Sequence, residues 1–257
     1  MNTIHIHHDD DGPIEIVDEA EGKLRSLQFG SPARQSTMFT ARPHELALEY
    51  TRTMAAGLLF LAAEPKRILV LGLGGGSLPK FFLHHFPDCH IDVAEIRPAI
   101  VDVATRFFKL PTSDEHLHVH LEDGYDFLLR VSAATYDLIF IDLHDAHGMA
   151  PVVDEEGFSE SCRLALRAEG VAVYNLWFGV RPQQEMHLRR RLEKTFHHLL
   201  RLPIAGKRNC VAYGLSRPIA AASSMTRRAT MGESNLGLAL PQVLEELRQR
   251  HPGAFAL

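Results

Sequence analysis

Cysteine is scarce in this sequence, and membrane-length apolar runs are missing. The 257 residues include 3 cysteines, which are odd in number, far apart and without a Cys-x-x-Cys pair. We interpret them as reduced, cytoplasmic thiols. No uninterrupted apolar run reaches the roughly 18–20 residues of a membrane span, so we expect no membrane partner. Residues 1–12 are polar and acidic, whereas a signal peptide starts basic and then turns apolar.

The sequence also lacks an excess of positive charge. Its 27 Lys and Arg against 32 Asp and Glu give a formal charge of −5, and 46% of the residues are hydrophobic. This balance does not favour a nucleic-acid partner, and the apolar share is enough to bury a sizeable core. Histidine, by contrast, is abundant, with 16 residues.

Strand-like and helix-like segments alternate along the middle of the chain. The apolar run Arg67–Leu71 leads into a glycine-rich turn, a helical stretch over 78–85 and a strand over 90–94. This order is typical of a βαβ unit, and continuous apolar runs such as 138–141 indicate a parallel sheet covered on both faces. We therefore predict an α/β fold with an open, mostly parallel, doubly wound sheet. The remaining expected elements are helices over 98–108, 124–131, 155–167 and 182–196, and strands over 117–121, 137–141, 170–176, 198–203 and 209–215.

The beginning of the chain has a different pattern. Residues 1–40 carry short β-like pieces separated by turn residues, and we predict a small N-terminal β-hairpin module there. From Pro43 to about Ala63 apolar residues recur at helical spacing, with Pro43 in the first turn.

Residues 41–217 are then expected to form a Rossmann-like, nucleoside-binding catalytic domain. Residues 218–257 are predicted to be a tail. Its Ala-, Ser-, Thr- and Arg-rich part, 219–234, is expected to be a flexible linker, and 241–250 a short charged helix.

The glycine-rich turn and two acids suggest a nucleotide pocket. Gly72, Gly74 and Gly76 give a Gly-x-Gly-x-Gly turn between strand and helix, where a ligand can lie against bare backbone. Glu95 closes the second strand, where a carboxylate can bind both ribose hydroxyls, and Asp123 follows the third strand within reach of an adenine. The turn lacks the Gly-x-Gly-x-x-Gly spacing, which favours a nucleoside such as S-adenosylmethionine over a nicotinamide dinucleotide. Alternatively, both acids are ordinary turn residues at strand ends.

A further pair of acids follows the fourth strand. Asp142 and Asp145 lie three positions apart in a loop at the expected carboxyl edge of the sheet. They can converge on one cationic amine, and a carboxylate there can accept the amine's proton before it attacks an electrophile. The alternative is that either residue caps the following helix or loop.

On these motifs the chain resembles the spermidine synthase (polyamine aminopropyltransferase) family over about 64–215. The family pattern after the fourth strand is Asp-x-x-Asp-Pro-x-Gly-Pro-Ala, of which Asp142, Asp145, Gly148 and Ala150 are present. The resemblance implies a class I methyltransferase fold and a homo-oligomer. It also implies a small-molecule amine acceptor and S-adenosylmethionine, decarboxylated or intact, as co-substrate.

The resemblance also assigns roles to single residues. Asp142 is the implied base and Asp145 its partner in amine binding. The implied nucleoside-binding residues are Gly72, Gly74, Gly75, Gly76, Glu95, Asp123 and Gly124. Candidate acceptor-binding residues are Gln35, Tyr50, His144, His147 and Trp177. For Trp177 the alternative is an aromatic side chain of the core.

Three departures from the family pattern leave the reaction open. Gly75 stands where the family has an Asp that binds the donor's free amine, and its loss removes a repulsion against the carboxylate of intact S-adenosylmethionine. Thr51 and Arg52 follow Tyr50 where the family has His-Glu, and Ala146 replaces a proline. Aminopropyl transfer, methyl transfer from the intact donor and nucleoside binding without turnover are therefore all carried forward.

The histidines invite a metal site, which we do not expect. His5, His7 and His8 form one group and 116, 118 and 120 another, but no further ligands are identifiable for either. His144 and His147 lie in the acidic loop and can relay a proton, hold an acidic acceptor or tune the pKa of Asp142. Their alternative is a plain surface role. Arg52, Lys80, Arg97 and Arg189–Arg191 are expected to form solvated surface.

Overall fold

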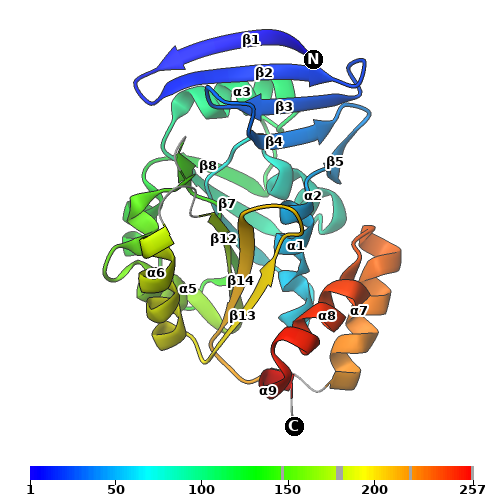
Figure 1. The fold of residues 1–257 in the computed structure, drawn as a ribbon, viewed down its shortest axis with the longest axis vertical. Coiled ribbons are helices and arrows are strands. Elements are labelled where there is room, and N and C mark those ends of the chain that lie inside the picture. The colour runs from blue at the N-terminus through cyan, green and yellow to red at the C-terminus, as the bar shows by residue number, and fades with distance from the viewer. Residues whose placement is uncertain (146–147, 178–181, 220–221, 256–257) are drawn as a thin grey trace.

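Two large β-sheets, a two-stranded β-ribbon and the covering helices make up the computed structural model, which describes residues 1–145, 148–177, 182–219 and 222–255. The first sheet has five strands in sequential order and stands at one end of the molecule (Figure 1). The second has seven strands in the order β13-β14-β12-β9-β6-β7-β8. The predicted α/β fold with an N-terminal β module is therefore confirmed.

The seven-stranded sheet is parallel except at β14, which runs antiparallel to both of its neighbours. Because the parallel strands end at one edge, the loops that follow them gather there. The strands are β6 (Arg67–Leu71), β7 (His90–Glu95), β8 (Leu117–Leu121), β9 (Tyr136–Ile141), β12 (Leu166–Trp177), β13 (His198–Pro203) and β14 (Asn209–Leu215).

Alternation along β6 explains why both faces of this sheet are covered. Ile68 and Val70 pack into a core formed with α2, α3 and α8, whereas Leu69 and Leu71 pack with α4, α5 and α6. Figure 1 shows α5 and α6 on the side opposite α7 and α8. The helices are α1 (Glu49–Ala55), η1 (Ala56–Phe60), α2 (Ser77–His85), α3 (Pro98–Phe108), α4 (Gly124–Arg130), η2 (Pro151–Asp154), α5 (Phe158–Ala165), α6 (Pro182–Thr195), α7 (Ala222–Leu236), α8 (Leu240–Arg250) and α9 (Pro252–Phe255).

The N-terminal sheet extends to Leu46, past the predicted module end at residue 40, and Pro43 lies in its last strand rather than in a helix. The expectation of a helix from Pro43 was wrong. The last strand is at the edge of the sheet, where a proline without an N–H does not interrupt the hydrogen-bond ladder, and the helix begins only at Glu49. The strands are β1 (Asn2–Asp9), β2 (Gly12–Glu19), β3 (Leu24–Gln28), β4 (Arg34–Phe39) and β5 (Arg42–Leu46).

Two cations expected on a solvated surface instead join the N-terminal sheet to the rest of the chain. Arg97 binds the carboxylate of Asp9 with an Nη2–Oδ1 distance of 2.7 Å. Lys80 is 6% exposed, and its amino group donates to the backbone oxygen of Phe108 and lies 3.5 Å from the sulfur of Met38. The first contact ties β1 to the residue before α3, and the second ties β4 to α2 and α3.

The predicted linker over 219–234 is also wrong, because α7 occupies most of it. Met225 and Ala229, four residues apart, are both buried and belong to the main core together with Leu240, Leu244 and Leu247 of α8. The polar composition of the segment hid this narrow apolar stripe. The predicted helix over 241–250 is present as α8. Among the described residues, no helix is both long and apolar enough to cross a membrane.

Candidate active site

A cavity of about 1070 Å³ opens at the carboxyl edge of the parallel strands. Its walls come from the glycine turn after β6, the ends of β7, β9 and β12, the β3–β4 loop and the β13–β14 loop. The arrangement follows from the topology, because open α/β sheets bind ligands at this edge.

The glycine turn packs directly against the acidic loop. Gly72 has a φ of +89°, and a Cβ on it would lie 2.6 Å from the backbone oxygen of Asp142. In addition, the backbone N–H of Asp142 donates to the oxygen of Leu71 at 3.0 Å. Only glycine permits this close approach, which places the start of the acidic loop beside the turn.

The turn contributes to the cavity only in part. Of the described residues that line the cavity, Gly72 and Gly74 belong to the turn, whereas Gly75 and Gly76 lie outside the lining. A Cβ on Gly75 would stand 2.7 Å from the hydroxyl of Ser36 and 2.9 Å from the ring of Phe108. The position where the family has an Asp is thus closed by two side chains, and its polar neighbour is a serine hydroxyl rather than an acid.

Glu95 lies buried at the end of β7. Its Oε2 accepts a hydrogen bond from the backbone N–H of Leu73, and its Oε1 accepts one from the N–H of Arg97, both at 2.9 Å. Burial raises the pKa of Glu95 above its usual range, and the backbone donors offset part of that shift. Each carboxylate oxygen keeps capacity for a second donor, such as a ribose hydroxyl.

Asp123 caps α4 and also lines the cavity. Its Oδ1 accepts from the backbone N–H of Tyr125 at 2.7 Å and of Asp126 at 3.3 Å. The alternative role as a capping residue is therefore present in the structure. The cap fixes the carboxyl group at the edge of the cavity, where Gly124 also contributes to the wall.

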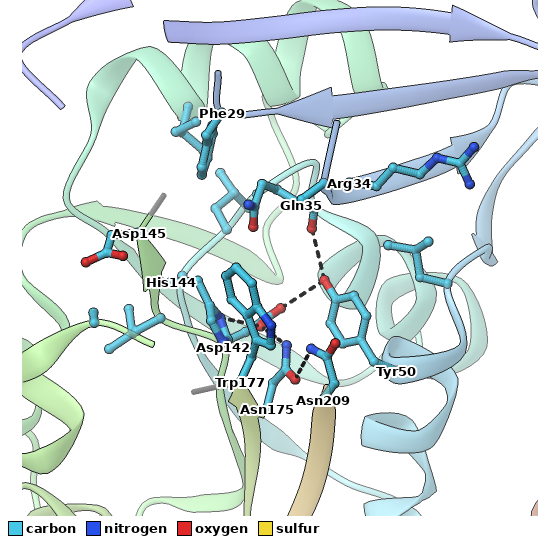
Figure 2. Close-up of a pocket in the computed structure, with 18 of the residues that line it drawn as sticks. Phe29, Arg34, Gln35, Tyr50, Asp142, His144, Asp145, Asn175, Trp177 and Asn209 are labelled. Atoms are coloured by element: carbon cyan, nitrogen blue, oxygen red, sulfur yellow. Dashed lines mark hydrogen bonds and ion pairs between the residues drawn. The ribbon is translucent and has the colours of Figure 1, made fainter. Parts of the chain in front are cut away.

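Side chains from four elements meet around Asp142 (Figure 2). Its Oδ1 accepts a hydrogen bond from the Asn175 amide at 2.7 Å and lies 3.2 Å from Nδ1 of His144. Its Oδ2 lies 3.3 Å from the Tyr50 hydroxyl, and the Asn209 amide donates to the Asn175 oxygen at 3.0 Å. A carboxylate held in this way has one fixed orientation in the cavity.

The Tyr50 hydroxyl connects this cluster to the N-terminal sheet. Its single proton can go either to the backbone oxygen of Gln35, at 3.0 Å, or to Asp142, at 3.3 Å, and Figure 2 shows the Gln35 side chain beside the cavity. Burial, and after it the charge of Asp142, raise the pKa of Tyr50 well above its usual range. The phenol therefore stays protonated and acts as a donor.

The second acid of the loop has a local role as well. Asp145 lines the cavity from β10 (His144–Asp145), and its Oδ1 accepts from the N–H of Gly148 in β11 (Gly148–Met149) at 2.9 Å. Trp177 lines the cavity at the end of β12, with its ring centroid 6.0 Å from that of His144. His147 and the neighbouring Ala146 lie outside the described residues.

Sequence reasoning missed Asn175 and Asn209. Asn175 was signalled only by being a polar residue in an otherwise apolar strand, and Asn209 only by its place at the start of the last strand. Arg52, by contrast, turns away from the cavity, because its guanidinium donates to the backbone oxygens of Leu46 and Ala47. It does not replace the family's acid in the cavity.

One histidine of the group 116, 118 and 120 contacts a carboxylate of the sheet. His120 lies 3.0 Å from Oδ1 of Asp92. The hydroxyl of Tyr136 and the guanidinium of Arg67 donate to the other carboxylate oxygen, Oδ2. Across the described residues, no three His, Cys, Asp or Glu side chains come together as a metal site.

Comparison with known proteins now identifies the family. The Spermine/spermidine synthase domain model matches residues 47–200, more than half of the chain. The chain belongs to this family. This confirms the resemblance inferred from the acidic loop and the glycine turn.

Curated relatives and solved structures cover nearly the whole length of this family member. The polyamine aminopropyltransferase of Chromobacterium violaceum is 32% identical over 237 residues, which are 91% of this chain and 90% of that protein. A probable spermidine synthase from Corynebacterium glutamicum has the same fold, with a TM-score of 0.76 and 18% identity. The match covers 100% of this chain and 96% of that one.

Similarity to a methyltransferase is also present. The structure of human methyltransferase-like protein 13 in complex with SAH has a TM-score of 0.65 and 28% identity. The match covers 79% of this chain and 93% of that one.

Proposed function

We propose that this family member transfers an aminopropyl group from decarboxylated S-adenosylmethionine to an amine acceptor. The observation that carries the proposal is the Asp142 carboxylate, fixed by Tyr50, Asn175 and His144 in the same cavity as the glycine turn and Glu95. The curated aminopropyltransferases that align with nearly the whole chain support it.

In this proposal the cavity holds two substrates side by side. Glu95 binds the ribose hydroxyls of the donor, and Asp123 with Gly124 lies at its adenine. Asp145, Gln35 and Trp177 contact the acceptor. Holding the two reactants in line removes much of the entropic cost of a bimolecular reaction.

Asp142 takes a proton from the acceptor's ammonium group. The freed amine attacks the carbon next to the sulfonium, a C–N bond forms, and the C–S bond breaks with its electron pair on sulfur. The products are an extended amine and neutral methylthioadenosine. The protein supplies position, desolvation and one base.

Methyl transfer from intact S-adenosylmethionine is the second candidate, and Gly75 favours it. Because no carboxylate can stand at this position without displacing Ser36 or Phe108, the cavity lacks the repulsion that excludes the carboxylate of the intact donor. The similarity to the SAH-bound human methyltransferase-like protein 13 points the same way.

A turnover assay with both donors distinguishes these candidates. The purified chain is incubated with each donor and a panel of diamines, and methylthioadenosine and S-adenosylhomocysteine are quantified. We expect the wild-type chain to form methylthioadenosine and the D142N variant to form it about 100-fold or more slowly. The affinity of D142N for the donor, measured by calorimetry, should stay within about 3-fold of the wild-type value. S-adenosylhomocysteine alone would replace aminopropyl transfer by methyl transfer. Micromolar binding without either product would leave a nucleoside-binding homologue.

We further propose that the chain acts as a homo-oligomer in the cytoplasm, without a metal and without nucleic-acid or membrane partners. Family membership supports the oligomer, and the free thiols of Cys89, Cys162 and Cys210 suit a reducing compartment. Light scattering of the purified chain tests the oligomeric state.

A further inference from the structure

His144 differs from the other side chains that contact Asp142. Its Nδ1 lies 3.2 Å from Oδ1 of Asp142, and its side chain is only 8% exposed. The ring is flanked by Trp177, and its Nε2 is buried without a hydrogen-bond partner among the described residues. Within the described part of the chain this buried imidazole has one polar contact, to the proposed base, which calls for a chemical explanation.

Of the three side chains in contact with Asp142, only the imidazole can take up a proton. The Asn175 side chain is an amide and has no basic nitrogen. The Tyr50 phenol keeps its proton, because burial and the Asp142 charge raise the pKa of Tyr50. An imidazole ordinarily titrates near neutral pH and is therefore a better proton acceptor there than a carboxylate.

Other ionisable groups line the same cavity as the imidazole. They include Asp142 and Tyr50, the neighbouring Asp145 on β10, and Lys207 and Arg208 of the β13–β14 loop.

We propose that His144 is a positioning residue that, with its own hydrogen on Nε2 and Nδ1 facing Asp142, receives through Asp142 the proton of the acceptor ammonium. This inference rests on the proposed group transfer. An N–H bond of the ammonium breaks, and its proton passes to the Asp142 carboxyl group and on to Nδ1 of His144. The amine lone pair then forms the C–N bond, and the electron pair of the C–S bond stays on sulfur. An imidazolium and a carboxylate remain as a neutral pair.

Asparagine and phenylalanine variants separate orientation from proton uptake. In H144N an amide can keep a polar contact to Asp142 but cannot take up a proton, whereas H144F removes both the contact and the proton acceptor. H118N, at an exposed position of β8, is the matched control. The readout is kcat against pH at saturating donor and acceptor, together with KM for the donor.

We expect the wild-type kcat to fall as the pH is lowered, because an already protonated His144 cannot take up a further proton. H144N is expected to lose this acid limb and about 10- to 100-fold of kcat near pH 7.5, with KM for the donor within about 3-fold. H144F should be slower still, and H118N unchanged. A wild-type kcat and pH profile in H144N would overturn the inference.

A second measurement does not depend on turnover. The contact between His144 and Asp142 predicts that the ¹⁵N signal of Nδ1 of His144 moves in D142N. An unchanged signal would overturn the inference whether or not the wild-type chain transfers a group. Absence of turnover in the wild-type chain would instead contradict the proposed function.

Discussion

At the scale of single residues, Gly75 links the packing of the glycine turn to the choice of donor. The turn was recognisable from the sequence because its spacing after an apolar strand is distinctive. That Ser36 and Phe108 fill the space beside Gly75 was not, because those residues are 39 and 33 positions away in the chain. Only the fold shows that the family's acid and these two side chains exclude one another.

We therefore predict that an acid cannot be restored at Gly75 by a single substitution. G75D should lower the free energy of unfolding by about 1–3 kcal/mol, because its Cβ overlaps with Ser36 and the buried ring of Phe108. Urea unfolding measures the loss. G253D, where a Cβ meets nothing within 4 Å, is the control and should unfold with the wild-type chain. Equal midpoints for G75D and wild type would contradict the packing at Gly75.

The residues around Asp142 show a similar limit. Asp142, Glu95 and Asp123 were predictable, because each follows a recognisable strand and all such strands end at one edge. Asn175 and Asn209 were not, since an asparagine in a strand has no motif and its role depends on which strands are neighbours. That neighbourhood is set by the strand order, in which β12 lies between β9 and β14.

At the scale of elements, the strongly periodic segments were the predictable ones. The strands over 198–203 and 209–215 and the helix over 98–108 have the expected bounds, because long runs of one period specify one structure. Helix α7 was missed because only Met225, Ala229 and Leu236 carry its apolar face, amid alanine, serine and arginine. Its stability comes from packing against α8 rather than from its own composition.

This account of α7 predicts that truncating one of its two methionines destabilises the fold and that truncating the other does not. M225A should lower the free energy of unfolding by about 2–5 kcal/mol, because Met225 is fully buried in the main core. M231A, on the same helix but 59% exposed, should change it by less than about 0.5 kcal/mol. Urea unfolding of both variants is the measurement. If neither variant changed the free energy of unfolding, the segment would be a linker in solution.

At the scale of the whole molecule, the proposed active site depends on how the N-terminal sheet sits on the seven-stranded sheet. The β3–β4 loop forms one wall of the cavity and Tyr50 bonds to Gln35 within it. Lys80 stands at this junction, with its amino group between Phe108 of α3 and Met38 of β4. This contact was not predictable from the sequence, because a lysine side chain is normally solvated.

The buried Lys80 makes the stability of the junction depend on pH. Burial, with a smaller effect from Lys109, lowers the pKa of Lys80 from 10.5 to about 7. Between these values the unfolded chain binds a proton that the folded chain does not, so the free energy of unfolding should rise with pH, by at most about 1.4 kcal/mol per pH unit. In K80M this contribution is absent, and the unpaired oxygen of Phe108 adds a cost that does not change with pH.

Urea unfolding from about pH 7 to about pH 9.5 measures this difference. The free energy of unfolding of the wild-type chain should increase relative to that of K80M as the pH rises. K23M, whose lysine is 79% exposed, should run parallel to wild type, and parallel curves for K80M as well would show that Lys80 is charged in the folded chain.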